Sequence, residues 1–254
     1  MYATPDMIID TVRTFGINHP KPVQTLLDAA DALASTEADA PGWDGVLDPA
    51  KVGEVVRAHA QHKLTSGKEM REAINQAQLK IAQALSTEVK NNLETYIPQI
   101  EDVFAPAAEA YAEAVKDLPR EFTATEVTDW APAQFDAYTR AKQASQIIEQ
   151  AKNWMLNLGK VVRAESFPNH LNNELIVLEP DCLERYAAIQ KATGNTDPAM
   201  RAVNPVRLRA VQDGARLQLQ QPSRVREVVA GFERERQAMT PWEDQQLHQR
   251  TPSY

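Results

Sequence analysis

The sequence has little cysteine, little glycine and few aromatic residues, and each shortage excludes a class of protein. Its 254 residues include one cysteine, Cys182, which excludes an internal disulfide and a cysteine-based zinc cluster. Only 9 glycines accompany 16 prolines, and aromatic residues make up 6% of the chain, whereas all-β proteins need Gly-rich turns and aromatic strand faces. The composition therefore favours a helical protein.

Long apolar runs are also missing. No stretch approaches ~18 consecutive apolar residues, which is the length that a membrane-spanning helix needs. The first residues, Met1 to Asp6, lack a basic region followed by an apolar one, so we expect no secretory signal peptide. We expect no membrane partner, and a location in the cytoplasm or within an assembled particle. Hydrophobic residues at 43% and charged residues at 24% are typical of a chain that folds.

The charge of the chain is unevenly distributed. The formal net charge is −8, but residues 199–254 contain nine Arg, no Lys and six acidic residues, a net charge of +3, which leaves −11 for residues 1–198. Arginine forms bidentate pairs with carboxylates and is enriched at protein interfaces. The sequence therefore predicts that residues 199–254 form an Arg-rich helical arm that attaches the protein to another chain.

Prolines indicate where helices begin. The fixed φ of proline suits the first helical turn, where its missing N–H is not needed. The prolines that open expected helices are Pro5, Pro49, Pro132, Pro180, Pro198, Pro205, Pro222 and Pro241.

Two long helices are expected in the middle of the chain. Ser66 and Glu69 have the spacing of a capping box, and apolar or small residues then recur about every 3.7 residues as far as residue 118, close to the period of a straight helix. Pro98 and Pro106 predict a kink or break between residues 97 and 106. We predict that helices at about 67–97 and 132–162 pack as an antiparallel hairpin.

The predicted fold class is all-α, with this hairpin inside a helical bundle. The expected segments are short N-terminal helices over 1–65, the hairpin over 66–165, a connecting segment with a short helix over 166–198, and the Arg-rich arm with its polar tail over 199–254. Within the arm, helices are expected at about 205–220 and 222–238, followed by a polar tail from Thr240. The run from Leu175 to Leu178 is the one candidate strand.

No catalytic or metal-binding pattern emerges. His59 and His62 lie three residues apart and could face one metal ion, but the Glu-x-x-His and His-Glu-x-x-His patterns are both absent, so we interpret them as part of a polar helix face. Lys68 follows Gly67 without the other residues of a phosphate-binding loop. Cys182 is interpreted as a core or helix-start residue rather than a nucleophile. We predict a non-enzymatic protein without catalytic residues, cofactor or metal.

The candidate partner-binding residues lie in the C-terminal arm. An aromatic ring in a polar tail is typical of an interface anchor, and the arginines could pair with a partner, with solvent or with acids of the same chain. Interleaved Glu227, Glu233 and Glu235 disfavour nucleic acid, because they would lie beside the phosphates. The candidates are Arg201, Arg207, Arg209, Arg216, Arg224, Arg226 and Trp242.

The sequence favours a structural or assembly subunit of a larger protein complex, such as a virion or another multi-subunit particle. Its expected partners are copies of itself or neighbouring subunits. The alternative is a regulatory or binding module that contacts nucleic acid through the Arg-rich C-terminal segment. Salt separates the two hypotheses, because phosphate binding weakens steeply as the salt concentration rises.

Overall fold

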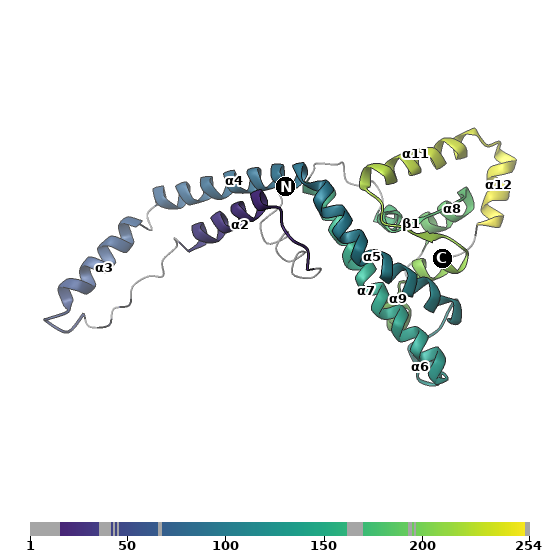
Figure 1. The fold of residues 1–254 in the computed structure, drawn as a ribbon, viewed down its shortest axis with the longest axis horizontal. Helices are drawn as coiled ribbons and strands as arrows, with labels where there is room; N and C mark the ends of the chain where they lie inside the picture. The colour runs from purple at the N-terminus through teal and green to yellow at the C-terminus, as the bar shows by residue number, and fades with distance from the viewer. Residues whose placement is uncertain are drawn as a thin grey trace. The chain divides into compact units, whose positions relative to one another are not determined.

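The protein is mostly helical (Figure 1). The structure is a computed structural model, and it describes residues 16–35, 42, 44, 46–65, 68–161, 170–192, 195 and 197–251. The chain divides into two compact units, Met1–Glu94 and Thr95–Tyr254. None of the helices in the described ranges is long and apolar enough to cross a membrane.

The first unit contains three described helices, α2 (Lys21–Ala34), α3 (Val52–Thr65) and α4 (Lys68–Asn91). Helix α2 packs along α4, as its place in Figure 1 also indicates. The buried side chains of these two helices include Val23 and Leu27 on α2 and Ile74, Leu85 and Val89 on α4. The helix expected after Pro5 and the Ser66 side of the predicted capping box lie outside the described residues.

The second unit is organised around two long helices. Helix α5 (Leu93–Ala114), of which all but two residues belong to this unit, continues into the 3-10 turn η1 (Val115–Asp117), and a short helix α6 (Ala124–Thr128) precedes α7 (Pro132–Val161). Tyr96 near the start of α5 contacts Trp154 late in α7, with ring centroids 5.7 Å apart. Phe122, beyond η1, contacts Tyr138 early in α7 at 5.9 Å. Helices α5 and α7 therefore run antiparallel.

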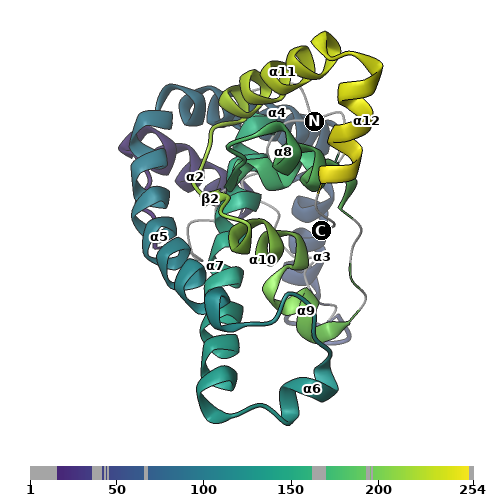
Figure 2. The same ribbon diagram turned by 90° about the vertical axis from the view of Figure 1, so that its right-hand side faces the viewer.

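The remaining elements pack against this pair and against one another (Figure 2). Helix α9 and the 3-10 segment η2 contact α7, while α11 and α12 contact α8. Their bounds are η2 His170–Ile176, β1 Leu178–Glu179, α8 Leu183–Lys191, α9 Pro198–Val203, α10 Pro205–Gln212, β2 Arg216–Leu217, α11 Pro222–Ala238 and α12 Pro241–Arg250.

The predicted break near residues 97–106 is displaced. Pro98 and Pro106 both lie inside α5, and the chain is interrupted instead at Asn92, whose side-chain amide donates to the Glu88 carbonyl at 2.7 Å. Both prolines are exposed, so water can satisfy the carbonyls that lack a helical donor. Within this unit α5 runs antiparallel to α7, while the predicted hairpin of residues 67–97 with 132–162 would join the two units and stays a prediction.

The C-terminal segment differs from the expected arm and polar tail. Helices α9 to α12 pack onto the second unit, and α12 occupies most of the segment that was expected to be a polar tail. Thr240 and Glu243 form a capping box at its start, and Leu247 is buried with 5% of its surface exposed. One buried leucine and a local cap therefore order a segment whose composition is polar.

Leu247→Ala is expected to lower the free energy of unfolding of the second unit by about 2 kcal/mol, because the substitution leaves a cavity at the contact between α12 and the rest of the unit. Trp242 is the matched control, since it lies on the same helix and is 65% exposed. Trp242→Ala should change the free energy by less than about 0.5 kcal/mol. Urea denaturation of both variants measures the difference, and equal losses would contradict the packing of α12.

Candidate functional site

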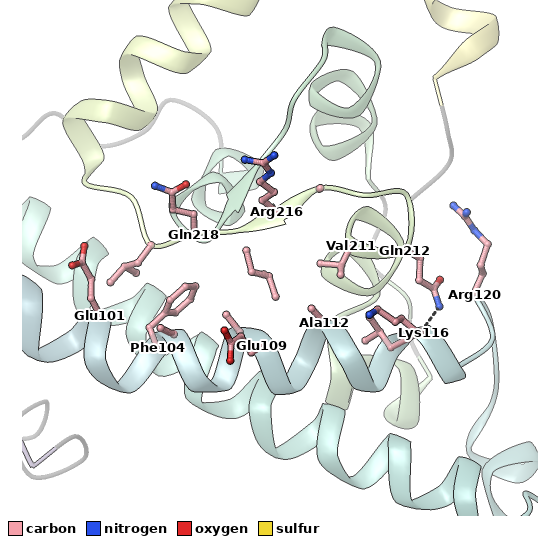
Figure 3. Close-up of a pocket in the computed structure, with 16 residues that line it drawn as sticks. Glu101, Phe104, Glu109, Ala112, Lys116, Arg120, Val211, Gln212, Arg216 and Gln218 are labelled. Atoms are coloured by element: carbon pink, nitrogen blue, oxygen red, sulfur yellow. Dashed lines mark hydrogen bonds between the residues drawn. The ribbon is translucent and has the colours of Figure 1, made fainter.

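A groove of about 1100 Å³ crosses the second unit between α5 and the segment 215–219 (Figure 3). One wall is a face of α5 with small side chains, Ala105, Ala108 and Ala112. The opposite wall is β2 and the two residues after it. The other lining residues are Glu101, Phe104, Glu109, Val115, Lys116, Arg120, Val211, Gln212, Ala215, Arg216, Leu217, Gln218 and Leu219.

A tight turn after α10 sets the course of the β2 wall. The Gly214 N–H donates to the Val211 carbonyl and the Ala215 N–H donates to the Ala210 carbonyl, both at 2.9 Å. These are the two hydrogen bonds of a Schellman motif, and Gly214 has the positive φ of 94° that the motif requires. Glycine adopts this conformation without a steric penalty, so the chain reverses here and runs back along α5.

Two glutamine side chains hold the walls in place. Gln212 on α10 donates to the carbonyls of Val115 and Leu118 at 2.9 and 2.8 Å, which fixes the end of α10 against the end of α5. Gln220 is buried, and its side chain donates to the carbonyls of Leu175 and Leu178 at 3.1 and 3.3 Å. Because these amides satisfy buried carbonyls, the groove is bounded by a hydrogen-bonded scaffold.

The pairing of β2 with β1 covers only one edge of β2. The register is antiparallel, with Leu217 opposite Leu178. Beyond the paired residues, the Gln218 N–H donates to the Val177 carbonyl at 3.1 Å and the Gln220 N–H donates to the Ile176 carbonyl at 2.7 Å. The second edge of β2 has no partner strand in the part of the chain that the structure describes.

The charges along the groove differ in whether they are already paired. Arg120 forms two hydrogen bonds with Asp213, at 2.5 and 3.0 Å, and Lys116 pairs with Glu113. Glu101 and Glu109 are exposed on α5, and neither makes an ion pair with another described residue. These two carboxylates lie about 12 Å apart along α5 and face solvent, and Arg216 on the opposite wall is likewise exposed and makes no ion pair with another described residue.

A second polar cluster lies between α7, η2 and α10. Arg207 is fully buried, and its guanidinium donates to Glu149 and Glu174 at 3.1 Å each and to the Ser145 hydroxyl at 3.2 Å. Lys152 pairs with both carboxylates, at 2.8 Å for Glu149 and at very short range for Glu174. Two cations and two anions therefore balance each other below a polar cleft of about 1010 Å³.

The electrostatics of this cluster favour the charged forms. Burial by itself raises the pKa of the Glu174 carboxyl, but Arg207 and Lys152 outweigh burial and hold that pKa below its usual range. Burial lowers the pKa of the Arg207 guanidinium, and Glu174, Tyr111 and Glu149 more than reverse this effect. Burial also raises the pKa of Tyr111, whose hydroxyl donates to the Val203 carbonyl at 2.6 Å.

The structure does not gather the predicted partner-binding residues on one surface. Arg207 lies inside the second unit, and Arg209 is buried and paired with Glu121 at 3.0 Å, so these two are not part of an exposed interface. They pair with glutamates of the same chain, whereas the sequence predicted that they would pair with a partner chain. The other candidates lie apart, Arg201 at the polar cleft, Arg216 in the groove, Arg224 and Arg226 on α11, and Trp242 on α12.

The acidic residues of both sites, Glu149 and Glu174 in the buried cluster and Glu101 and Glu109 in the groove, were not among the predicted site residues. Glu149 and Lys152 lie three residues apart on α7, but nothing local in the sequence indicates that Glu174 meets them. The β2 wall had a visible signal, because apolar and polar residues alternate from Arg216 to Gln220 after the turn-forming pair Asp213 and Gly214. We assigned these residues to a helix over 205–220, whereas α10 ends at Gln212.

Among the residues that the structure describes, no group of three or more His, Cys, Asp or Glu side chains could hold a metal ion. His59 and His62 both lie on α3, and Cys182 is a free thiol that immediately precedes α8. Comparisons of the chain with protein-family models, with curated proteins and with solved structures found no match.

Proposed function

We propose that the protein is a non-enzymatic structural or assembly subunit whose partners are other protein chains, first of all further copies of itself. The observation that carries this proposal is helix α3 in the first unit. None of the α3 side chains that the structure describes is buried, and none of the other described elements packs extensively against this helix. A helix of 14 residues is marginally stable in water without tertiary packing, so a partner surface that covers the exposed side of α3 would stabilise it.

The apolar face of α3 indicates where that surface binds. Val52 and Val56 are four residues apart and therefore lie on the same side of the helix, with 37% and 51% of their surfaces exposed. Leu47 before the helix and Leu79 on α4 are further large apolar side chains in the first unit that are exposed to solvent. A two-fold contact uses the same patch on both subunits, so two copies can bury this apolar face against each other.

In this proposal the assembly is a virion or another multi-subunit particle, and the charges of the C-terminal helices favour protein partners over nucleic acid. The exposed arginines of α11 alternate with acids, and Arg224 already pairs with Glu227 at 3.1 Å. Arg236 pairs with Asp244 of α12 at the same distance. These pairs reduce the positive charge that is free to bind phosphates, and they favour protein partners over nucleic acid.

Replacing both valines of α3 by serine should weaken self-association by about tenfold or more. The variant Val52→Ser with Val56→Ser removes apolar surface that the contact would bury, and serine has about the same helix propensity as valine. Sedimentation over a range of concentrations measures the mass, which is 28.3 kDa for one chain. Glu54→Ser is the control, because it changes an exposed position on the opposite side of α3.

A wild-type protein that stays at the mass of one chain up to high concentration would contradict assembly by self-association. Equal association of the valine variant and wild type would show that α3 is not the contact. Tight binding of DNA or RNA that falls steeply with salt would favour the alternative, a nucleic-acid-binding module.

A further inference from the structure

The free edge of β2 carries unpaired backbone groups. Because the N–H groups of Gln218 and Gln220 point to the β1 side, alternation along the extended chain directs the N–H and C=O of Leu217 and Leu219 to the opposite edge. These backbone groups make no hydrogen bond with any residue in the described ranges. Leu219 is nonetheless only 8% exposed. An edge with free donors and acceptors at alternate residues is a template for another strand.

The groove beside this edge is long enough for an extended peptide. From Glu101 to Ala112 the α5 wall is about 17 Å long, which corresponds to about five residues of β-strand. The volume of about 1100 Å³ exceeds the usual range for small-molecule pockets, about 300–1000 Å³. In Figure 3 the stretch of α5 between Glu101 and Ala112 lies across from Gln218 of the β2 wall and Val211 of α10.

The chemistry of the walls specifies which side chains fit. The alanines of the α5 wall, which is the floor on which a bound strand would lie, are small and apolar and leave room for β-branched side chains. Side chains alternate in direction along a strand, so every second one would face this floor. Glu101 lies at one end of the floor and Glu109 lies about 12 Å further along α5, and a basic side chain can pair with either carboxylate. The backbone edge, the apolar floor and the two carboxylates along it are complementary to one kind of ligand.

We propose that this groove binds an extended segment of another protein chain, which adds as a strand to the free edge of β2. Alternate small apolar side chains of the segment lie over Ala105, Ala108 and Ala112, and a basic side chain pairs with Glu101 or Glu109. The proposal rests on the function proposed above, because it specifies a site by which an assembly subunit holds a segment of its partner. Strand addition supplies affinity through the backbone, and the two walls supply selectivity.

Other occupants fit these observations less well. A bound helix would satisfy its own backbone and leave the donors of Leu217 and Leu219 unpaired. A nucleic acid would bring phosphates beside the free carboxylates of Glu101 and Glu109, which is unfavourable. An extended basic peptide satisfies the edge and the charges together.

The test uses the full chain and a fluorescent heptapeptide in which valines alternate with threonines and one arginine lies at each end. Fluorescence anisotropy measures its affinity. Two further peptides carry N-methyl groups on one or the other alternate set of residues. Because only one set faces β2, methylation of that set should weaken binding more than tenfold, while methylation of the other set should leave the affinity within about threefold.

Protein variants locate the site. Ala105→Trp fills the floor from an exposed position and should weaken binding of the unmethylated peptide more than tenfold. Glu109→Lys should weaken it several-fold by reversing a charge at the floor. Asp102→Lys is the matched control, since it makes the same charge change at an exposed residue of α5 that does not line the groove, and it should change the affinity by less than about twofold.

Three results would overturn the proposal: no binding of the peptide by the wild-type protein, equal binding of both methylated peptides, and equal binding by the Ala105→Trp and Asp102→Lys variants. Self-association that Ala105→Trp abolishes, without binding of the peptide, would assign the groove to a second copy and also overturn it. Sedimentation of the Val52→Ser and Val56→Ser variant reports on the first unit alone. Failure of the groove is therefore distinguishable from failure of the assembly function.

Discussion

Replacing Arg207 by methionine is expected to lower the free energy of unfolding by about 3–5 kcal/mol, which is the usual loss when one partner of a buried ion pair is removed. Arg207 is fully buried, and it is the cation that joins α10 to Glu149 on α7 and to Glu174 on η2. Without it, Lys152 alone faces two carboxylates. Glu149 can turn to water, but Glu174 keeps only 13% of its side chain exposed.

The matched control for this variant is Arg224→Met. Arg224 pairs with Glu227 at 3.1 Å, the same distance as the Arg207 pairs, but 61% and 68% of the two side chains are exposed. An exposed pair contributes about 0–1 kcal/mol, so this variant should unfold almost as the wild-type protein does. Urea denaturation followed by circular dichroism gives both free energies. Losses of similar size would show that burial of Arg207 does not make its ion pairs important for stability.

A double-mutant cycle tests whether Arg207 and Glu174 act on each other. In the variant Arg207→Met with Glu174→Gln, one cation and one anion remain, so the cluster is again balanced. The combined loss should therefore be smaller than the sum of the single losses, by about 0.5–3 kcal/mol. Additive losses would mean that each residue acts through separate contacts, and they would contradict a joint network.

Helices with strong local signals were predicted well from the sequence. Pro132 and the helical period predicted a helix at 132–162, and α7 covers Pro132–Val161. Pro222 and the expected end near residue 238 match α11, Pro222–Ala238. In both cases the signals lie within the helix itself, a proline at its first position and, for α7, a face of regular apolar spacing, so no distant contact is needed to recognise them.

The two sites could not be predicted in the same way, because they depend on contacts between distant segments. Arg207 and Arg209 are two residues apart on α10 and look equivalent in the sequence, yet the first points to Glu149 and the second to Glu121. The direction of α10 depends on Asn204, whose positive φ of 60° separates α9 from α10 and whose side chain caps α10. A non-glycine residue in this conformation has no dependable sequence signal.

Acid is expected to weaken the buried cluster through Glu174. Arg207 and Lys152 hold the pKa of this carboxyl below its usual value, whereas in the unfolded chain the pKa returns to about 4.3. A carboxyl whose pKa is lower in the folded state stabilises the fold at every pH above its unfolded pKa. This contribution is lost as the pH falls from about 5 towards the folded-state pKa, while both cations keep their charge.

Glu174→Gln should therefore cost about 3 kcal/mol at pH 7, and its cost relative to the wild-type protein should shrink below about pH 4. Urea denaturation at constant ionic strength, in steps from pH 7 to pH 3, measures the difference between the two proteins at each pH. Glu227→Gln is the control, since this carboxylate is exposed on α11 and its removal should cost little at any pH. A Glu174→Gln cost that stays constant or grows in acid would contradict a charged Glu174 in the folded protein.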